Sequence, residues 1–440
     1  MMIAANRRLG VFSLATLLVS AHYGLGFILG TAEQAMAKGA GGSLYAVSIG
    51  LGFLTLLALA KFYWSEVEQI WTLLGNRYGK PVKVGVGLMS WTSLIGIEAV
   101  QIISAASILG VAGIPKLPST IALAILFCIL SLLPVERASW VFRGLLLFNM
   151  LALLYALWRL QSLPELWQAP LTFIAALRHV DVQEAIGVSV ATILLVLIDM
   201  KCQQFVVQAK DVRIAYWGCI LAAIALIGLA FLPTTVAIAG QNTGILPANV
   251  TGKEAIPYIL SWIGGGANQP WGIVLMLALA VPALGIGSNI LRIQTKTVLD
   301  LEVIANTQRN QILISILNAL FAFGIALKDG EIIGLILYFY AAYLSTVWIP
   351  FAAYLLAHAR IYVFSDTSVR LSFFIGALTS LSALGIALFY PEAIVFNSAE
   401  LTIMAMGMGF GGLSLLAVQM VEKYLLVPKT QTQEEHSHDV

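Results

Sequence analysis

The chain has 440 residues, of which 60% are hydrophobic and only 10% are charged; its net charge is +2 and its mean hydropathy is +0.91. Soluble domains carry about 25% charged residues, so this composition excludes a soluble globular protein. No charged, well-mixed stretch of about 100 residues occurs, which excludes a separate soluble domain as well. The three cysteines lie in apolar segments at unrelated spacings and are interpreted as free thiols.

Long apolar segments recur along the whole chain. A bilayer span needs about 20 predominantly apolar residues, and we predict an all-α polytopic membrane protein with about 12 transmembrane helices. The predicted spans are residues 9–34, 42–62, 84–112, 118–134, 141–160, 185–206, 213–239, 271–297, 309–327, 331–358, 371–390 and 400–425. Residues 426–440 are a polar tail, predicted to be cytoplasmic, with His436 and His438 in it.

The basic residues indicate an orientation. Lysine and arginine are enriched in cytoplasmic loops. With the N-terminus inside, 6 of the 24 basic residues fall on the outer side and the other 18 on the inner side. The outer six are Lys38, Lys116, Arg159, Arg178, Lys253 and Lys328. We therefore predict an integral protein of the plasma (inner) membrane with a cytoplasmic N-terminus.

The stretch "SAHYGLGFILGTAEQAMAKGAGG", residues 20–42, is unusually polar and glycine-rich for a lipid-crossing helix. One interpretation is packing, because Gly26-x-x-x-Gly30 is a small-residue face that lets helices approach closely. The other is a helix broken near His22, Tyr23 and Gly24, as transporters use to hold solutes near mid-membrane. The sequence alone leaves both open.

Titratable groups inside spans are functional candidates by default. Glu98 lies in the third predicted span with Gln101 one turn further on, and His22 titrates near physiological pH. A His22/Glu98 pair could carry a coupling proton; alternatively, Glu98 hydrogen-bonds to a neighbouring helix. Asp199 and Lys201 lie close to the inner end of the sixth span, where we expect an inner gate or a structural charge cluster.

Three stretches resemble the solute:sodium symporter family, which has the leucine-transporter fold. "FILGTAEQAMAKGAGG" is similar to its first core helix, with Gly30 and Gly39 at two glycine positions. "SNILRIQTKTVLDL" is similar to the inner half of core helix 8 through Ser288, Asp300 and Leu301. The most specific stretch is "IDMKCQQFVVQAKDVRIAYWG", where Phe205 replaces the family's arginine. Its matching residues are Asp199, Gln204, Ala209, Lys210, Asp211, Ala215 and Gly218.

The resemblance implies a 5+5 inverted repeat. Residues 1–160 would form the first repeat, 185–358 the second, and 371–425 two peripheral helices. Spans 1, 3, 6 and 8 would surround the solute. The residues predicted to bind it are His22, Tyr23, Gly24, Gly26, Glu98, Gln101 and Ser288. Asp199, Lys201 and Gln204 would form the inner gate. Span 6 has no Gly or Pro at its middle, so no break is visible there.

The family's shared sodium site combines span 1 carbonyls with a hydroxyl pair in span 8. The carbonyls would belong to Ser20 and Tyr23. The span 8 positions fall on Val281, Leu284 and Gly285, and the last two, at the hydroxyl positions, have no side-chain oxygen. A register slip of about three residues would bring Ser288 toward the site. Coupling to Na+, coupling to H+ and ion-independent transport all remain open at this point, and we expect no other metal or cofactor.

The resulting hypothesis is a secondary active transporter that moves a small polar solute by alternating access. Its expected partners are that small-molecule solute and membrane lipid, with no nucleic acid; the oligomeric state is left open. The alternative is a transporter-like membrane sensor without transport activity. An enzyme is not expected, because the sequence contains no H-E-x-x-H motif and no paired aspartates within spans.

Overall fold

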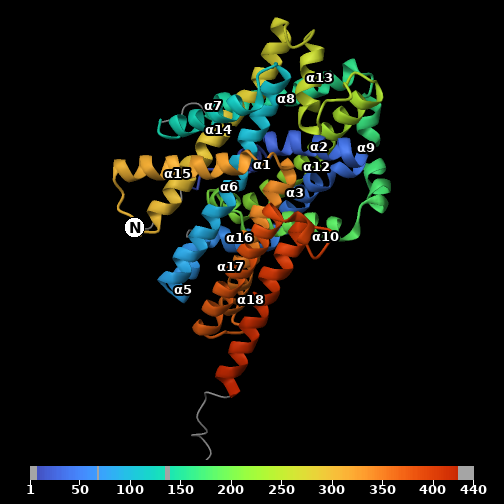
Figure 1. Cartoon of the computed structure of the whole chain (residues 1–440). Coiled ribbons are helices and arrows are strands. Elements are labelled where there is room, and N and C mark those ends of the chain that lie inside the picture. The colour runs from blue at the N-terminus through green and yellow to red at the C-terminus, as the bar shows by residue number, and fades with distance from the viewer. Residues whose placement is uncertain (1–6, 67–68, 134–138, 425–440) are drawn as a thin grey trace, which may run out of the picture.

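The computed structural model describes residues 7–66, 69–133 and 139–424 (Figure 1). Apart from one isolated bridge between Leu9 and Ala209, their regular structure is helical. The first half contains α1 (Val11–His22), α2 (Leu25–Lys38), η1 (Gly39–Ser43), α3 (Leu44–Thr55), α4 (Leu57–Ser65), α5 (Ile70–Tyr78), α6 (Lys80–Val111), α7 (Lys116–Ser131), α8 (Ser139–Arg159) and α9 (Leu163–Ala176). The second half contains α10 (Val182–Ile198), α11 (Met200–Val207), α12 (Val212–Asn242), η4 (Gly252–Glu254), α13 (Ala255–Ile263), α14 (Pro270–Asp300), α15 (Gln308–Ala326), α16 (Ile332–His358), α17 (Asp366–Phe389) and α18 (Ala399–Tyr424).

These helices confirm a polytopic membrane protein. Among the described residues, 8 helices are long and apolar enough to cross a membrane, or up to 10 if each of two bent pairs is one span. Each of the twelve predicted segments coincides with a helix or a pair of helices, but α7 has only 16 residues. The total of twelve spans therefore stays a prediction, and so do the repeat boundaries. The tail 426–440 lies outside the described residues.

The core of the bundle forms around α6 and α16. α6 packs against α14 and α16, α12 packs against α1 and α3, and α10 packs against α3 and α16. α17 and α18 pack on each other and on α16 and extend away from the other helices (Figure 1). The peripheral role expected for residues 371–425 stays a prediction.

Charged side chains gather at two opposite ends of the bundle. Lys116 and Lys253, both predicted to be outside, meet at Asp329. Arg370, predicted to be inside, donates from Nε to the carbonyl of Tyr78 at 2.6 Å. We name the end that holds Lys116, Lys253 and Asp329 the outer face and the end that holds Arg370 and Tyr78 the inner face, after the predicted orientation; the alternation of the spans between them stays a prediction. Which face is cytoplasmic stays a prediction.

Candidate functional site

The first predicted span is broken between His22 and Leu25. α1 ends at His22, Tyr23 leaves helical geometry with φ −79° and ψ 74°, and Gly24 is extended with φ −120° and ψ −169°. The segments on the two sides of the break are bent by 56°. A break leaves the last carbonyls of α1 and the first N–H groups of α2 without partners inside their helices. The broken-helix interpretation is therefore confirmed.

The packing interpretation holds as well, one turn further on. A Cβ at Gly26 would lie 2.9 Å from Ile336, and one at Gly30 would lie 2.8 Å from both Ile332 and Ile333. Real Cβ atoms essentially never come that close, so a side chain at either position would force the isoleucines of α16 to shift. The helix break and the glycine packing face are therefore adjacent parts of the first predicted span.

The sixth predicted span is also broken, at Asp199. α10 ends at Ile198, α11 begins at Met200, and Asp199 between them is extended with φ −65° and ψ 122°. Its Oδ1 accepts a hydrogen bond from the N–H of Lys201 at 2.7 Å, which caps α11. The absence of Gly and Pro concealed this break in the sequence, because an aspartate makes it by capping a new helix.

The two breaks lie against each other. His22 Nε2 is 3.6 Å from Asp199 Oδ2, and both side chains are about 8% exposed. His22 Nδ1 lies 3.0 Å from the carbonyl of Leu18, and its ring meets the edge of Phe53 at 5.0 Å. The predicted His22/Glu98 pair is wrong: His22 faces Asp199, whereas both carboxylate oxygens of Glu98 are buried with no hydrogen-bond partner.

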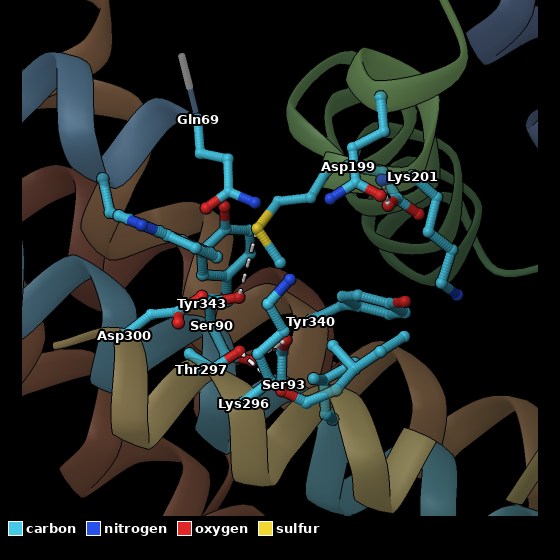
Figure 2. Close-up of a pocket in the computed structure, with 15 residues that line it drawn as sticks. Gln69, Ser90, Ser93, Asp199, Lys201, Lys296, Thr297, Asp300, Tyr340 and Tyr343 are labelled. Carbon is cyan, nitrogen blue, oxygen red and sulfur yellow. Dashed lines mark hydrogen bonds between the residues drawn. The ribbon is translucent and has the colours of Figure 1, made fainter. Parts of the chain in front are cut away.

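A cavity of about 170 Å³ reaches Asp199 from the inner half of the bundle (Figure 2). Its walls come from α5, α6, α14, α16 and the α10–α11 break. The polar side chains on them include Ser90, Ser93, Asp199, Lys201, Gln204, Lys296, Thr297, Asp300, Tyr340 and Tyr343. All three predicted gate residues thus lie on one wall of one cavity. Their gating role stays a prediction.

None of the seven predicted solute-binding residues is part of the lining of this cavity. Tyr23 is 4% exposed and its hydroxyl has no hydrogen-bond partner. Gln101 is 4% exposed and its Oε1 is also unpartnered. These atoms and the Glu98 carboxylate are buried polar groups without hydrogen-bond partners. They are exceptions, because buried polar groups normally have partners. The binding roles of the seven residues stay predictions.

The span 8 positions expected for sodium are apolar in the structure. Gly24 faces α14 through Ile286, whose Cδ1 would lie 3.2 Å from a Cβ at Gly24. Ser288, which a register slip would have brought into the site, donates its hydroxyl to the carbonyl of Gly285 in its own helix at 3.3 Å. The contact of α14 with Gly24 is therefore a hydrocarbon side chain, and the sodium-site roles of Ser20, Tyr23, Val281, Leu284 and Gly285 stay predictions.

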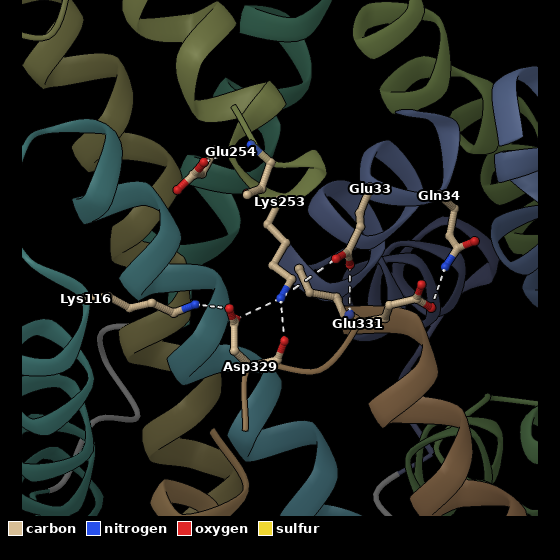
Figure 3. A network of polar contacts seen from close by, with 9 residues as sticks. Glu33, Gln34, Lys116, Lys253, Glu254, Asp329 and Glu331 are labelled. Atoms are coloured by element: carbon tan, nitrogen blue, oxygen red, sulfur yellow. Dashed lines mark hydrogen bonds and ion pairs between the residues drawn. The ribbon is translucent and has the colours of Figure 1, made fainter. Parts of the chain in front are cut away.

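A charge network lies on the outer side of the same breaks (Figure 3). Lys253 Nζ donates to Asp329 Oδ1 at 2.8 Å and lies 3.8 Å from Glu33 Oε1 on α2. Lys116 on α7 also pairs with Asp329. Glu33 Oε2 accepts from the N–H of Ile332 at 2.8 Å, at the start of α16. We call Glu33, Lys116, Lys253 and Asp329 the outer network.

The outer network has a defined charge state at Asp329, which lies in the loop before α16. Partial burial alone would raise the pKa of this carboxyl, but the ammonium groups of Lys116 and Lys253 outweigh it and hold the pKa below its usual range. Asp329 therefore stays ionised at neutral pH, and the network joins α2, α7, η4 and the start of α16.

Several cavity residues were not singled out from the sequence: Ser90, Ser93, Lys296 and Thr297. A signal was present, because Ser90 and Ser93 are three residues apart and share one face of α6. Cys202, interpreted as an inert thiol, lies one turn after Asp199 on α11 and is completely buried. Cys202 lies close to His22, which is 180 residues earlier in the chain. Spacing in the sequence could not reveal that proximity.

No protein-family model matches the sequence, and no curated protein matches it. The structure is similar to a solved structure of a Na+-coupled sialic acid symporter in its substrate-bound, outward-open state. That match has a TM-score of 0.58 and 12% sequence identity, and it covers 95% of this chain and 91% of the other. The predicted likeness to sodium-coupled solute symporters is therefore confirmed at the level of the fold.

Proposed function

We propose that the chain is a secondary active transporter that moves a small polar solute by alternating access. The observation that carries the proposal is the meeting of two helix breaks, at Tyr23–Gly24 and at Asp199, next to a polar cavity. Broken helices near the middle of a bundle are the usual sites of solute and ion binding in transporters. The fold shared with a Na+-coupled symporter supports the same conclusion.

The cavity lining favours a small polar solute over a purely apolar one. It combines hydroxyl groups with both signs of charge, from Asp199, Lys201, Lys296 and Asp300. Such a lining can exchange hydrogen bonds with a polar molecule that has lost its water. In this proposal the solute enters from the outer side, past the outer network, and leaves through the inner cavity. With the predicted orientation, the inner cavity leads to the cytoplasm.

Sodium does not fit the expected coupling site. Sodium is a hard cation that binds oxygen ligands, by analogy with other hard cations. Leu284 and Gly285, at the two hydroxyl positions, have no side-chain oxygen. We therefore propose H+ as the coupling ion, with Glu98 as its carrier. An isolated buried carboxylate costs several kcal/mol, so a proton is expected to accompany Glu98 when it lies in this environment.

The test is uptake by purified protein in liposomes, with a library of small polar solutes and with Na+ and H+ gradients imposed separately. The proposal predicts concentrative uptake of at least one solute under a proton gradient. Uptake driven by sodium alone would contradict the coupling proposal and leave the transport proposal intact. Saturable solute binding without any uptake would contradict transport and favour the membrane sensor.

A further inference from the structure

Three ligand-type side chains converge where the two helix breaks meet. His22, Asp199 and Cys202 each offer one ligand atom, and these atoms all lie within 4.8 Å of one another. Asp199 and Cys202 are three residues apart across the start of α11, which places both side chains on one face. His22 reaches the pair from the end of α1. Cys202 is fully buried and Asp199 is 7% exposed.

The hydrogen bonds around His22 fix which nitrogen is free. His22 Nδ1 lies 3.0 Å from the carbonyl of Leu18, and a carbonyl only accepts, so Nδ1 carries the proton. Nε2 is buried and has no hydrogen-bond partner. A histidine that binds a metal commonly donates its other N–H to a carbonyl in this way. The arrangement presents the Nε2 lone pair to the cluster.

Asp199 is oriented in the same sense. Its Oδ1 accepts from the N–H of Lys201 at 2.7 Å, which leaves Oδ2 to face His22. In both His22 and Asp199, a backbone group thus holds one polar atom of the side chain and leaves the other polar atom free. The backbone around both breaks fixes the direction of the two free ligand atoms.

The distance between these atoms suits a shared ion. Oδ2 and Nε2 are 3.6 Å apart, whereas a charge-assisted hydrogen bond measures about 2.7–2.9 Å. Two ligand atoms about 2.1 Å from one tetrahedral metal ion are separated by roughly 3.4 Å. A carboxylate oxygen and an imidazole lone pair repel each other unless a cation lies between them. That cation is either a proton on His22 or a metal ion.

Ligand chemistry and charge decide between metals. A thiolate and an imidazole suit Zn2+ and its neighbours, not Na+, Mg2+ or Ca2+. One carboxylate and one thiolate balance the two charges of such an ion, so the occupied site adds no net charge to the interior of the bundle. Asp199 also lines the inner cavity, which supplies an entry path and room for a water molecule as fourth ligand.

We infer that His22, Asp199 and Cys202 bind one divalent transition-metal ion of the zinc class at the meeting point of the two helix breaks. The ion would join α1 to α11 in the conformation that the structure describes. Binding requires the Cys202 thiol to lose its proton, which is released to water through the cavity. This inference goes beyond the proposed transport function, because it concerns binding at equilibrium and holds for whatever solute the protein moves.

The experiment titrates the purified, chelator-treated full chain in detergent with Co2+ and, separately, with Zn2+. His436 and His438 of the tail are replaced by alanine in every sample, so that they do not contribute binding. We expect one equivalent of each metal and, with Co2+, a near-ultraviolet thiolate-to-metal charge-transfer band. Cys202→Ser should abolish the band and weaken Zn2+ binding at least about tenfold.

Cys219→Ser is the matched control, because Cys219 is also a fully buried free cysteine but lies outside the cluster. It should keep the band and the full affinity. His22→Gln keeps Cys202 and should still weaken Zn2+ binding, and its melting profile without metal shows whether it folds. Absence of saturable binding, or a charge-transfer band that survives Cys202→Ser, would overturn the inference and leave a proton on His22 as the cation.

Discussion

The outer and inner sides of the two helix breaks differ in what lies between their helices. On the outer side, Glu33, Lys116, Lys253 and Asp329 join α2 to α7, η4 and the start of α16 through ion pairs. On the inner side, a cavity of about 170 Å³ separates α6 and α14 from α11. Ion pairs connect the elements on the outer side, whereas a cavity lined by Asp199 lies between the elements on the inner side. This asymmetry is what one conformation of an alternating-access transporter requires.

The largest expected effect comes from replacing Asp199, which forms the second helix break and lines the inner cavity. Asp199→Ala deletes the cap of α11 and the partner of His22, so we expect uptake to be abolished and stability to fall by about 0.5–2 kcal/mol from the lost cap. Asp211→Ala is the matched control, because Asp211 also caps a helix, accepting from Ile214 N–H at 2.8 Å, but lies away from the breaks. Equal loss of uptake in both variants would contradict a special role for the break.

Glu98→Gln tests whether the unpartnered carboxyl moves a proton between the two sides. The amide is nearly isosteric and cannot take up a proton. Concentrative uptake under a proton gradient should fall to the level of simple equilibration, while exchange of labelled for unlabelled solute continues. Uptake and exchange are measured on the same liposomes. Undiminished accumulation would show that Glu98 carries no coupling proton.

Lys253→Met tests the closure of the outer side. The change leaves Glu33 without its cation and removes one of the two lysines at Asp329, which destabilises the closed outer face. Each 1.4 kcal/mol of destabilisation multiplies the outward-open fraction about tenfold. Reaction of a cysteine at Gln34 with a charged thiol reagent from the outer side reports the change. Lys328→Met is the control, since Lys328 bonds to the carbonyl of Leu388 outside the network.

The smallest expected effect is a pH dependence of the same closure. The lowered pKa of Asp329 stabilises the closed state above the ordinary aspartate pKa of about 3.9, and this stabilisation is lost as the pH falls through the lower folded value. The contribution of Asp329 to outer-side labelling at Gln34 should therefore be constant across neutral pH and change only under strongly acidic conditions. A midpoint near neutral pH would assign the pH dependence to another member of the outer network, such as Glu33.

The sequence was informative wherever one short stretch carried the signal. The polar residues around His22 made a broken first helix one of two interpretations, and Gly39, a glycine position of the resemblance, ends α2 with a φ of 58° that favours glycine. The sequence was silent on the second break, because Asp199 makes it by capping α11 and no Gly or Pro marks the position. It paired His22 with the wrong carboxylate, since helix positions do not determine which distant side chains meet. The cavity likewise depends on the mutual placement of five helical elements.

The most direct test of the central asymmetry is the accessibility of Ser93, which lines the inner cavity on α6. A Ser93→Cys variant in sealed, oriented vesicles is treated with a charged thiol reagent on one side only, and the unsubstituted chain supplies the background of its three native cysteines. We expect reaction from the inner side and protection from the outer side, with outer-side reaction appearing when Lys253→Met is added. Rapid outer-side reaction of Ser93→Cys alone, or none from the inner side, would contradict it.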